Sequence, residues 1–448
     1  MTSITVLTPT GTLGYGFGTE ALASGMRFTP DVIAVDAGST DPGPHYLGSG
    51  EPLVSRFSMK RELTDLIIAS RKANIPLVVG SAGGSGCRSH VDWTVAIVRE
   101  IAREQQLSFR LAWIYADIQD ERVKRAISRG EIRDFEAGFT LTDSMLDDTV
   151  ALVAQMGHEP IATALDIGAD VVIAGRSCDD SAIAAFAIAR GAEPGLAMHM
   201  GKILECGAFS AEPFGMDVMV GIIKDDHFLL EPGSRARRAS VTSVAAHTLY
   251  ERENPFHQAG PGHVMDLSEC RFEQVSERRV KVSGSRFIAN AEYWVKLEGA
   301  GLAGFRSVTI AGIRCPSMIE RIDGILEDVR AEALRYFAPQ TFKIGFHVYG
   351  RDGVMGRLES QDRITSHELG LVIDALAPDQ ELAHAVAHHV SGTLLHHHYP
   401  GQFNTSGNLA FPYSPSEIDA GPSYRFSVYH LMKLDSPLEV FPIHHEDL

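Results

Sequence analysis

The chain has 448 residues, of which 44% are hydrophobic and 22% charged, so it is an ordinary globular sequence long enough for two domains. Its formal net charge of −17, with no offsetting basic patch, excludes nucleic acid as an expected partner. No apolar run approaches the roughly eighteen residues of a membrane span, and the first residues lack a basic segment, so neither a membrane partner nor a secretory signal is expected. Five scattered cysteines without a Cys-x-x-Cys pair indicate a reducing cytoplasm.

The first half of the chain alternates short apolar runs with stretches of helical spacing. Strands are expected at residues 4–7, 32–35, 76–79, 111–115 and 171–174, and helices at 59–73, 90–105, 119–128 and from 181 onward. Such alternation is typical of βαβ units with right-handed crossovers. We therefore expect an α/β fold whose N-terminal domain, residues 1–213, contains a mostly parallel sheet with flanking helices.

The pattern changes near Pro213. Two strands are expected within 216–230, a helix at 241–250, alternating half-exposed strands from 278 to 313, a long amphipathic helix at 316–337 and a strand at 343–349. This pattern predicts an α+β second domain over residues 214–448. Its C-terminal part is rich in histidine and includes a helix at 381–398.

Polar residues gather in the loops that follow the expected strands. Asp36, Ser39, Thr40 and Asp41 follow the second strand, Ser81, Gly83, Gly84, Ser85 and Arg88 the third, and Arg176, Ser177, Asp179 and Asp180 the fifth. Because open α/β sheets bind ligands at the carboxyl ends of parallel strands, these loops are expected to converge on one site. The alternatives are that Asp179 or Asp180 serves only as a helix cap, and that the glycines serve only close packing.

The residue types in these loops suit acid–base chemistry on a small acid. Asp36, Asp41, Asp179 and Asp180 are the candidate acids and bases. The guanidinium of Arg176 is expected to bind a substrate carboxylate, so Arg176→Ala should raise KM or abolish turnover without unfolding the protein. The other expected substrate contacts are Ser39, Thr40, Ser81, Gly83, Gly84, Ser85, Arg88 and Ser177, together with Asn404 and Ser406 in a polar C-terminal loop.

No cofactor motif is complete. The glycine-rich loop at 80–86 lacks the Gly-Lys-Ser/Thr ending of a Walker loop and the Gly-x-Gly-x-x-Gly spacing of a dinucleotide site. His384 and His388 lie one turn apart on the expected helix, but no glutamate stands between them as in a zinc protease. We predict no particular cofactor, and a divalent metal held by residues from separate loops stays open.

Several segments resemble the acyclic terpene utilisation family: residues 36–44, 168–176, 246–251 with Asn254-Pro255, and 279–285. The resemblance covers most of the chain, from residue 1 to about 430. Residues 36–44, 399–401 and 407–412 further resemble a sub-branch labelled as related to methylaspartate ammonia-lyase or glutamate mutase. The resemblance implies catabolism of a small branched acid, free or as a CoA thioester.

These observations predict a cytoplasmic enzyme of lyase or hydratase type that acts on a small branched carboxylic acid or its CoA thioester. Size and class favour a homo-oligomer. One alternative is a non-catalytic ligand-binding subunit of a catabolic complex, which needs a pocket but no acid and base. The other is a metal-dependent hydrolase with Asp36, Asp41, Asp179, Asp180 and the histidines as ligands.

Overall fold

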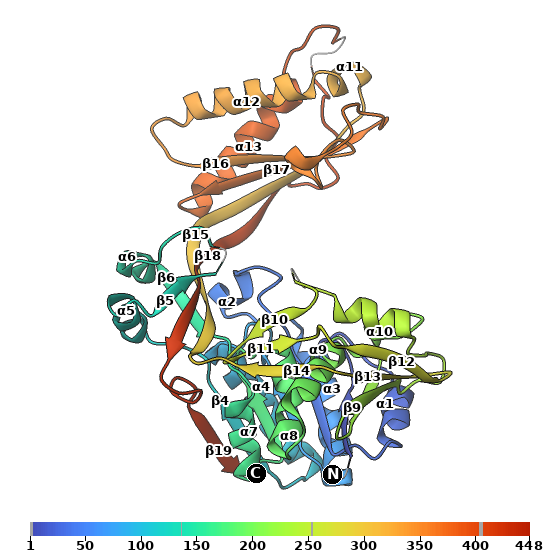
Figure 1. Cartoon of the computed structure of the whole chain (residues 1–448). Helices are drawn as coiled ribbons and strands as arrows, with labels where there is room; N and C mark the ends of the chain where they lie inside the picture. Colours follow the sequence, from blue (N-terminus) through green and yellow to red (C-terminus); the bar gives the residue numbers. More distant parts are fainter. Residues whose placement is uncertain (1–2, 136, 252–253, 403–405) are drawn as a thin grey trace. The chain divides into compact units, whose positions relative to one another are not determined.

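The computed structural model describes residues 3–135, 137–251, 254–402 and 406–448. The chain forms two compact units: unit 1 comprises Met1–Gly301 and Phe426–Leu448, and unit 2 comprises Leu302–Arg425 (Figure 1). Two long strands, β15 (Tyr293–Ile313) and β18 (Glu417–Leu434), contribute residues to both units. Residue 214, where the sequence pattern changes, lies within unit 1.

Unit 1 contains a ten-stranded mixed sheet. Its parallel centre runs β1 (Ile4–Thr8), β2 (Val32–Asp36), β3 (Leu77–Gly80), β7 (Val171–Ala174) and β4 (Arg110–Ile114). Antiparallel strands extend one edge in the order β8 (Met219–Ile223), β9 (His227–Pro232), β13 (Arg279–Ser283) and β12 (Arg271–Ser276), and β19 (Ile443–Asp447) extends the other. The prediction of an α/β fold with a mostly parallel N-terminal sheet is confirmed.

Helices cover both faces of this sheet because successive strand residues point to opposite sides. Val6 belongs to one apolar core and its neighbour Leu7 to the other. The core around Leu7 includes α3 (Arg56–Ala73) and α4 (Arg88–Gln105). The core around Val6 includes α7 (Glu159–Asp166), α8 (Asp179–Ala189) and α9 (Pro194–Leu204). Most of α8 is apolar and buried, as expected for a helix without a solvent face.

Unit 1 contains further helices and strands outside this sheet. They are α1 (Thr19–Met26), α2 (His45–Ser49), α5 (Asp120–Ser128), β5 (Ile132–Asp134), α6 (Asp143–Asp147), β6 (Thr149–Ala154), a 3-10 turn (Gly207–Ser210), α10 (Val241–Thr248), β10 (His257–Gly260), β11 (His263–Asp266) and β14 (Arg286–Ala289). β10, β11 and β14 form a small antiparallel sheet of their own. None of the helices in the described ranges is both long and apolar enough to cross a membrane.

Unit 2 is an antiparallel sheet packed against α12 and α13 (Figure 1). Its elements follow the order β15, α11 (Pro316–Ile319), α12 (Ile322–Tyr336), β16 (Lys343–Tyr349), a 3-10 turn (Gly356–Leu358), β17 (Leu369–Ala377), α13 (Gln380–His396) and β18. The strand order β16-β17-β15-β18 places the first strand between the third and the last, which is the ferredoxin-like arrangement. Val329, Leu371 and Leu394 lie in its apolar core, and the expectation of an α+β second part is confirmed.

Candidate active site

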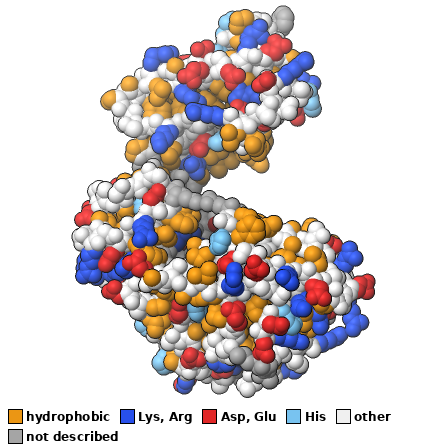
Figure 2. Space-filling model, in the orientation of Figure 1, with side chains coloured by type: hydrophobic (Ala, Val, Ile, Leu, Met, Phe, Trp, Pro, Cys, Tyr) orange, Lys and Arg blue, Asp and Glu red, His pale blue; other side chains and the backbone are white. Residues whose placement is uncertain are grey.

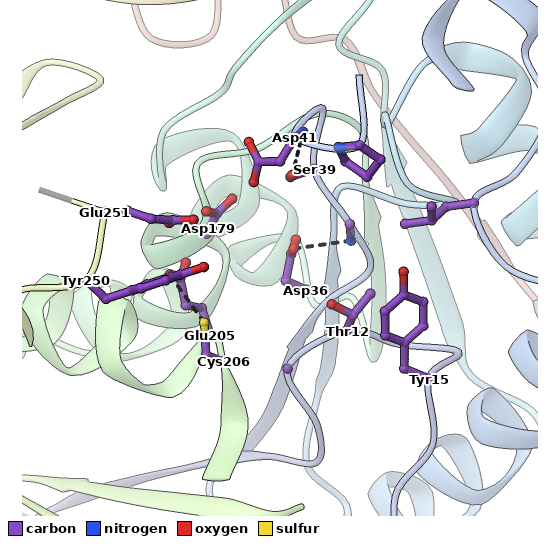
Figure 3. Close-up of a pocket in the computed structure, with 14 residues that line it drawn as sticks. Thr12, Tyr15, Asp36, Ser39, Asp41, Asp179, Glu205, Cys206, Tyr250 and Glu251 are labelled. Atoms are coloured by element: carbon purple, nitrogen blue, oxygen red, sulfur yellow. Dashed lines mark hydrogen bonds between the residues drawn. The ribbon is translucent and has the colours of Figure 1, made fainter. Parts of the chain in front are cut away.

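A cavity of about 250 Å³ lies in unit 1, where the parallel strands end (Figure 3). Its wall comes from the loops after β1 and β2, the start of α8, and the segments after α9 and α10. The lining residues are Gly11, Thr12, Tyr15, Asp36, Gly38, Ser39, Asp41, Pro42, Leu53, Asp179, Glu205, Cys206, Tyr250 and Glu251. Five of them carry carboxyl groups, so the wall is acidic.

Asp36 is the last residue of β2, and only 6% of it is exposed. Its Oδ2 accepts a hydrogen bond from the backbone N–H of Gly38 at 3.2 Å, whereas its Oδ1 is buried without a hydrogen-bond partner among the described residues. Burial raises the pKa of Asp36 well above its usual range, and the charge of Asp179 raises it further, against the opposing charge of Arg176. Asp36 is therefore placed to hold a proton.

Asp179 is the first residue of α8, where the helix dipole favours a negative charge. The N-cap of this helix is Cys178, so neither Asp179 nor Asp180 occupies the cap position. The Oδ1 of Asp179 lies 3.6 Å from the guanidinium of Arg176 and accepts no hydrogen bond. Figure 3 shows Asp179 facing the same space as Asp36 and Glu205. Asp179 therefore faces the cavity beside two positive charges, the N-terminus of its helix and Arg176.

Glu205 directly follows α9 and is only 4% exposed. Burial and the charge of Asp179 raise the pKa of Glu205 well above its usual range. Its Oε1 accepts a hydrogen bond from Lys202, and its Oε2 has no hydrogen-bond partner within the described part of the chain. Burial lowers the pKa of Lys202, but the charges of Glu205 and Asp179 outweigh this and raise it. Lys202 also pairs with Glu251 at 3.3 Å.

Arg176 is 2% exposed and lies behind the wall. Its Nε and Nη2 donate to the carboxylate of Glu298 at 2.7 and 3.3 Å. Glu298 also pairs with Lys296 at 2.7 Å and accepts from the hydroxyl of Thr40 at 2.8 Å. Burial alone would raise the pKa of Glu298, but the charges of Arg176 and Lys296 lower it to about 2. The guanidinium of Arg176 thus holds a protein carboxylate.

The chain matches the family model described as "Acyclic terpene utilisation family protein AtuA" over residues 57–413. It belongs to this family. The family is associated with acyclic terpene catabolism. A search of curated proteins and a search of solved structures each found no match. The matched range includes Asp179, Glu205, Tyr250 and Glu251, whereas Asp36 precedes it.

Four of the residues expected at the site line the cavity of this family member: Asp36, Ser39, Asp41 and Asp179. Four more lie behind the wall, in the hydrogen-bond network of Arg176 and Glu298: Arg176 itself, Ser81, Ser177 and Thr40. Arg176 donates to the Ser81 hydroxyl at 3.3 Å and to the Ser177 carbonyl at 3.1 Å, and Thr40 donates to Glu298. These residues support the wall and do not line it.

The other expected contacts lie elsewhere. Asp180 accepts from the hydroxyl of Ser181 at 3.1 Å, the Ser85 hydroxyl lies 3.1 Å from Nδ1 of His90, and Arg88 stacks on Tyr115 at 3.8 Å. A Cβ atom on Gly83 would lie 2.7 Å from Cβ of His90, and one on Gly84 would lie 2.7 Å from Cβ of Leu53, so these glycines serve close packing. Ser406 is exposed in unit 2, whereas the cavity wall comes from unit 1. Asn404 lies outside the described residues.

Several wall residues were not expected from the sequence: Thr12, Tyr15, Glu205, Cys206, Tyr250 and Glu251. Two signals could have found some of them. Lys202 and Glu205 are charged residues in an otherwise apolar stretch, and residues 246–251, which carry the family resemblance, end in Tyr250-Glu251.

Throughout the described ranges, no group of three or more His, Cys, Asp or Glu side chains is arranged to hold a metal ion. The histidines considered as ligands pair with carboxylates of β18 instead. His384 lies 3.0 Å from Asp419, and His388 lies 3.4 Å from Glu417. The metal-dependent hydrolase alternative therefore gains no support from these histidines.

Proposed function

We propose that the chain is an enzyme of acyclic terpene catabolism that catalyses an addition or elimination, as a lyase or hydratase does, by acid–base chemistry. The observation that carries the proposal is the pair Asp36 and Asp179, which face one cavity from different environments. Asp36 is buried with a raised pKa, whereas Asp179 lies at a helix N-terminus beside Arg176. Pairs of carboxyl groups separated in this way divide the roles of acid and base.

In the elimination direction, Asp179 accepts a proton from the carbon next to the substrate carbonyl. The electron pair of that C–H bond forms the new double bond. The bond to the leaving hydroxyl breaks, and Asp36 donates its proton so that water departs. Asp36 then carries the negative charge and Asp179 the proton, and hydration runs through the same steps in reverse. Arg176 acts on Asp179 through its charge rather than on a substrate carboxylate.

The proposal keeps the expected substrate class, a small branched carboxylic acid or its CoA thioester. Family membership supports this class, because the family is associated with acyclic terpene catabolism. The proposal also keeps a cytoplasmic location, which five scattered cysteines without a Cys-x-x-Cys pair favour, and a homo-oligomer as the assembly. The sub-branch related to methylaspartate ammonia-lyase or glutamate mutase stays a prediction.

The test is turnover by the purified full-length chain on branched 3-hydroxy and 2,3-unsaturated acids and on their CoA thioesters, followed by mass spectrometry. Asp179→Asn keeps the shape of the side chain, so we expect kcat to fall by about 10²–10⁴-fold. Glu320→Gln, an exposed change in unit 2, is the control and should leave kcat unchanged. Ligand binding without turnover of any substrate would favour the non-catalytic binding subunit, and full activity of Asp179→Asn would refute the assignment of the base.

A further inference from the structure

The cavity wall is rich in hydrogen-bond acceptors and poor in cations. Asp36, Asp41, Asp179, Glu205 and Glu251 contribute five carboxyl groups, and none of the lining residues in the described ranges is a lysine, arginine or histidine. The two nearby cations lie behind the wall and are already paired, Arg176 with Glu298 and Asp179, and Lys202 with Glu205 and Glu251. A ligand group that binds deep in this cavity therefore needs to donate hydrogen bonds.

Three carboxyl oxygens in particular lack a donor. Oδ1 of Asp36, Oδ1 of Asp179 and Oε2 of Glu205 are buried and accept no hydrogen bond from any residue that the structure describes. Leaving a buried polar atom without a partner is unfavourable, and more so when the atom is charged. Asp36 and Glu205 are each more than nine-tenths buried, and the three side chains come from three different elements. Figure 3 shows the three side chains around the same cavity.

Two tyrosine rings also line the cavity. Figure 3 shows Tyr15 and Tyr250 on opposite sides of the carboxyl groups. The faces of aromatic rings attract cations within about 6 Å of the ring centroid. Tyr250 already has one such neighbour: Nζ of Lys202, which lies behind the wall, is 5.9 Å from the centroid of the Tyr250 ring. The two tyrosine rings thus favour a positively charged ligand, as the carboxyl groups do.

We propose that this cavity binds the primary ammonium group of an organic ligand, which donates hydrogen bonds to Asp36, Asp179 and Glu205. An ammonium group has three N–H donors and no acceptor, which matches three oxygens that lack donors. A metal ion needs oxygen ligands at about 2.0–2.6 Å, and the described side chains offer no such arrangement, whereas N–H···O contacts are longer, at about 2.7–2.9 Å. The inference goes beyond the proposed function, whose substrates carry no amine. It names a further ligand class for the same cavity, small molecules that carry a primary amine, which bind when Asp36 has released its proton.

The test is isothermal titration calorimetry of the full-length chain at low ionic strength with n-butylammonium chloride as the probe. We expect one butylammonium per chain and no binding of n-butanol, which has a similar shape without the charge. Glu205→Gln removes one acceptor charge at nearly constant volume and should weaken binding at least tenfold. Glu320→Gln serves as the matched control, because Glu320 is exposed in unit 2, and it should leave the affinity unchanged. If Glu205→Gln does not fold, as judged by its melting transition, Asp36→Asn provides the second variant.

Three outcomes would overturn the inference. Equal affinity for butanol would mean that the cavity recognises the alkyl chain, and absence of binding would mean that protons alone satisfy the three oxygens. Binding of one Mg²⁺ per chain that displaces butylammonium would make this a metal site. The turnover assay separates this inference from the proposed function: loss of turnover in Asp179→Asn without butylammonium binding would remove the ammonium site and leave the acid–base assignment intact.

Discussion

Two buried glutamates, one in each unit, show how differently the chain treats the same side chain. Glu417 in unit 2 accepts hydrogen bonds from Ser391 at 2.8 Å and from Ser416 at 3.0 Å, and His388 lies 3.4 Å away. Burial would raise the pKa of Glu417, but these contacts outweigh burial and lower it. Glu205 in unit 1 has a raised pKa, because burial and the charge of Asp179 outweigh the effect of Lys202. Burial alone therefore does not distinguish the two residues.

The difference lies in the donors that surround each carboxylate. Glu417 joins β18 to α13 through Ser391, so its contacts stabilise unit 2. Glu205 and Asp36 keep unpartnered oxygens next to a cavity, which reduces the stability of unit 1. Proteins retain such unfavourable electrostatics chiefly where a ligand or a reaction uses them. The comparison thus supports our proposal that the active site lies in unit 1, and it indicates a structural role for Glu417 in unit 2.

Removing the cation behind the wall should have the largest effect on unit 1. Arg176→Ala leaves Glu298 buried with only Lys296 as a charged partner, and breaking a buried pair in this way costs about 3–5 kcal/mol. Chemical denaturation would measure the loss. The double variant Arg176→Met with Glu298→Gln should recover part of it, because it removes both charges. A stable Arg176→Ala protein that differs only in KM would support the role expected from the sequence, in which Arg176 binds a substrate carboxylate.

A cavity in the core of unit 2 should lower stability without changing the chemistry. Leu394 is fully buried in α13, so Leu394→Ala should cost about 2–5 kcal/mol. The kcat of the protein that remains folded should equal that of the wild type, measured below the melting transition of the variant. A reduced kcat in that folded fraction would show that unit 2 takes part in the reaction, and the division of roles between the units would then be wrong.

The sequence predicts the sheet of unit 1 well because its central strands are buried on both faces and read as short apolar runs. Val32–Asp36 and Val171–Ala174 stand out in this way. Asp36, the last residue of the first strand, and Asp179, in the turn after the second, both line the cavity. The strand Lys343–Tyr349 in unit 2 agrees with its expected range. A local pattern is therefore sufficient to predict a strand and the polar residues at its end, because they lie next to each other in the sequence.

Long-range partners could not be predicted, because nothing near a residue in the sequence specifies them. Arg176 and Glu298 are 122 positions apart, so the pairing that takes Arg176 away from a substrate leaves no local signal. Glu205 and Tyr250 reach the cavity from segments that follow helices rather than from strand ends. The residues that the sequence misses are therefore those that only tertiary packing brings to the cavity.

The last prediction tests the two carboxylates through the pH dependence of stability. The raised pKa of Asp36 means that the folded state binds more protons than the unfolded state above about pH 4, so wild-type stability falls as pH rises from there. Asn stays neutral, so Asp36→Asn should melt a few degrees above the wild type at pH 8, with a gap that closes toward pH 4. The lowered pKa of Glu417 reverses the sign: Glu417→Gln should melt below the wild type at pH 8, and the difference should shrink as the pH falls. Melting curves from pH 4 to pH 8 would measure the difference in Tm between each variant and the wild type. Differences of the same sign for the two variants would contradict the opposite pKa shifts of Asp36 and Glu417.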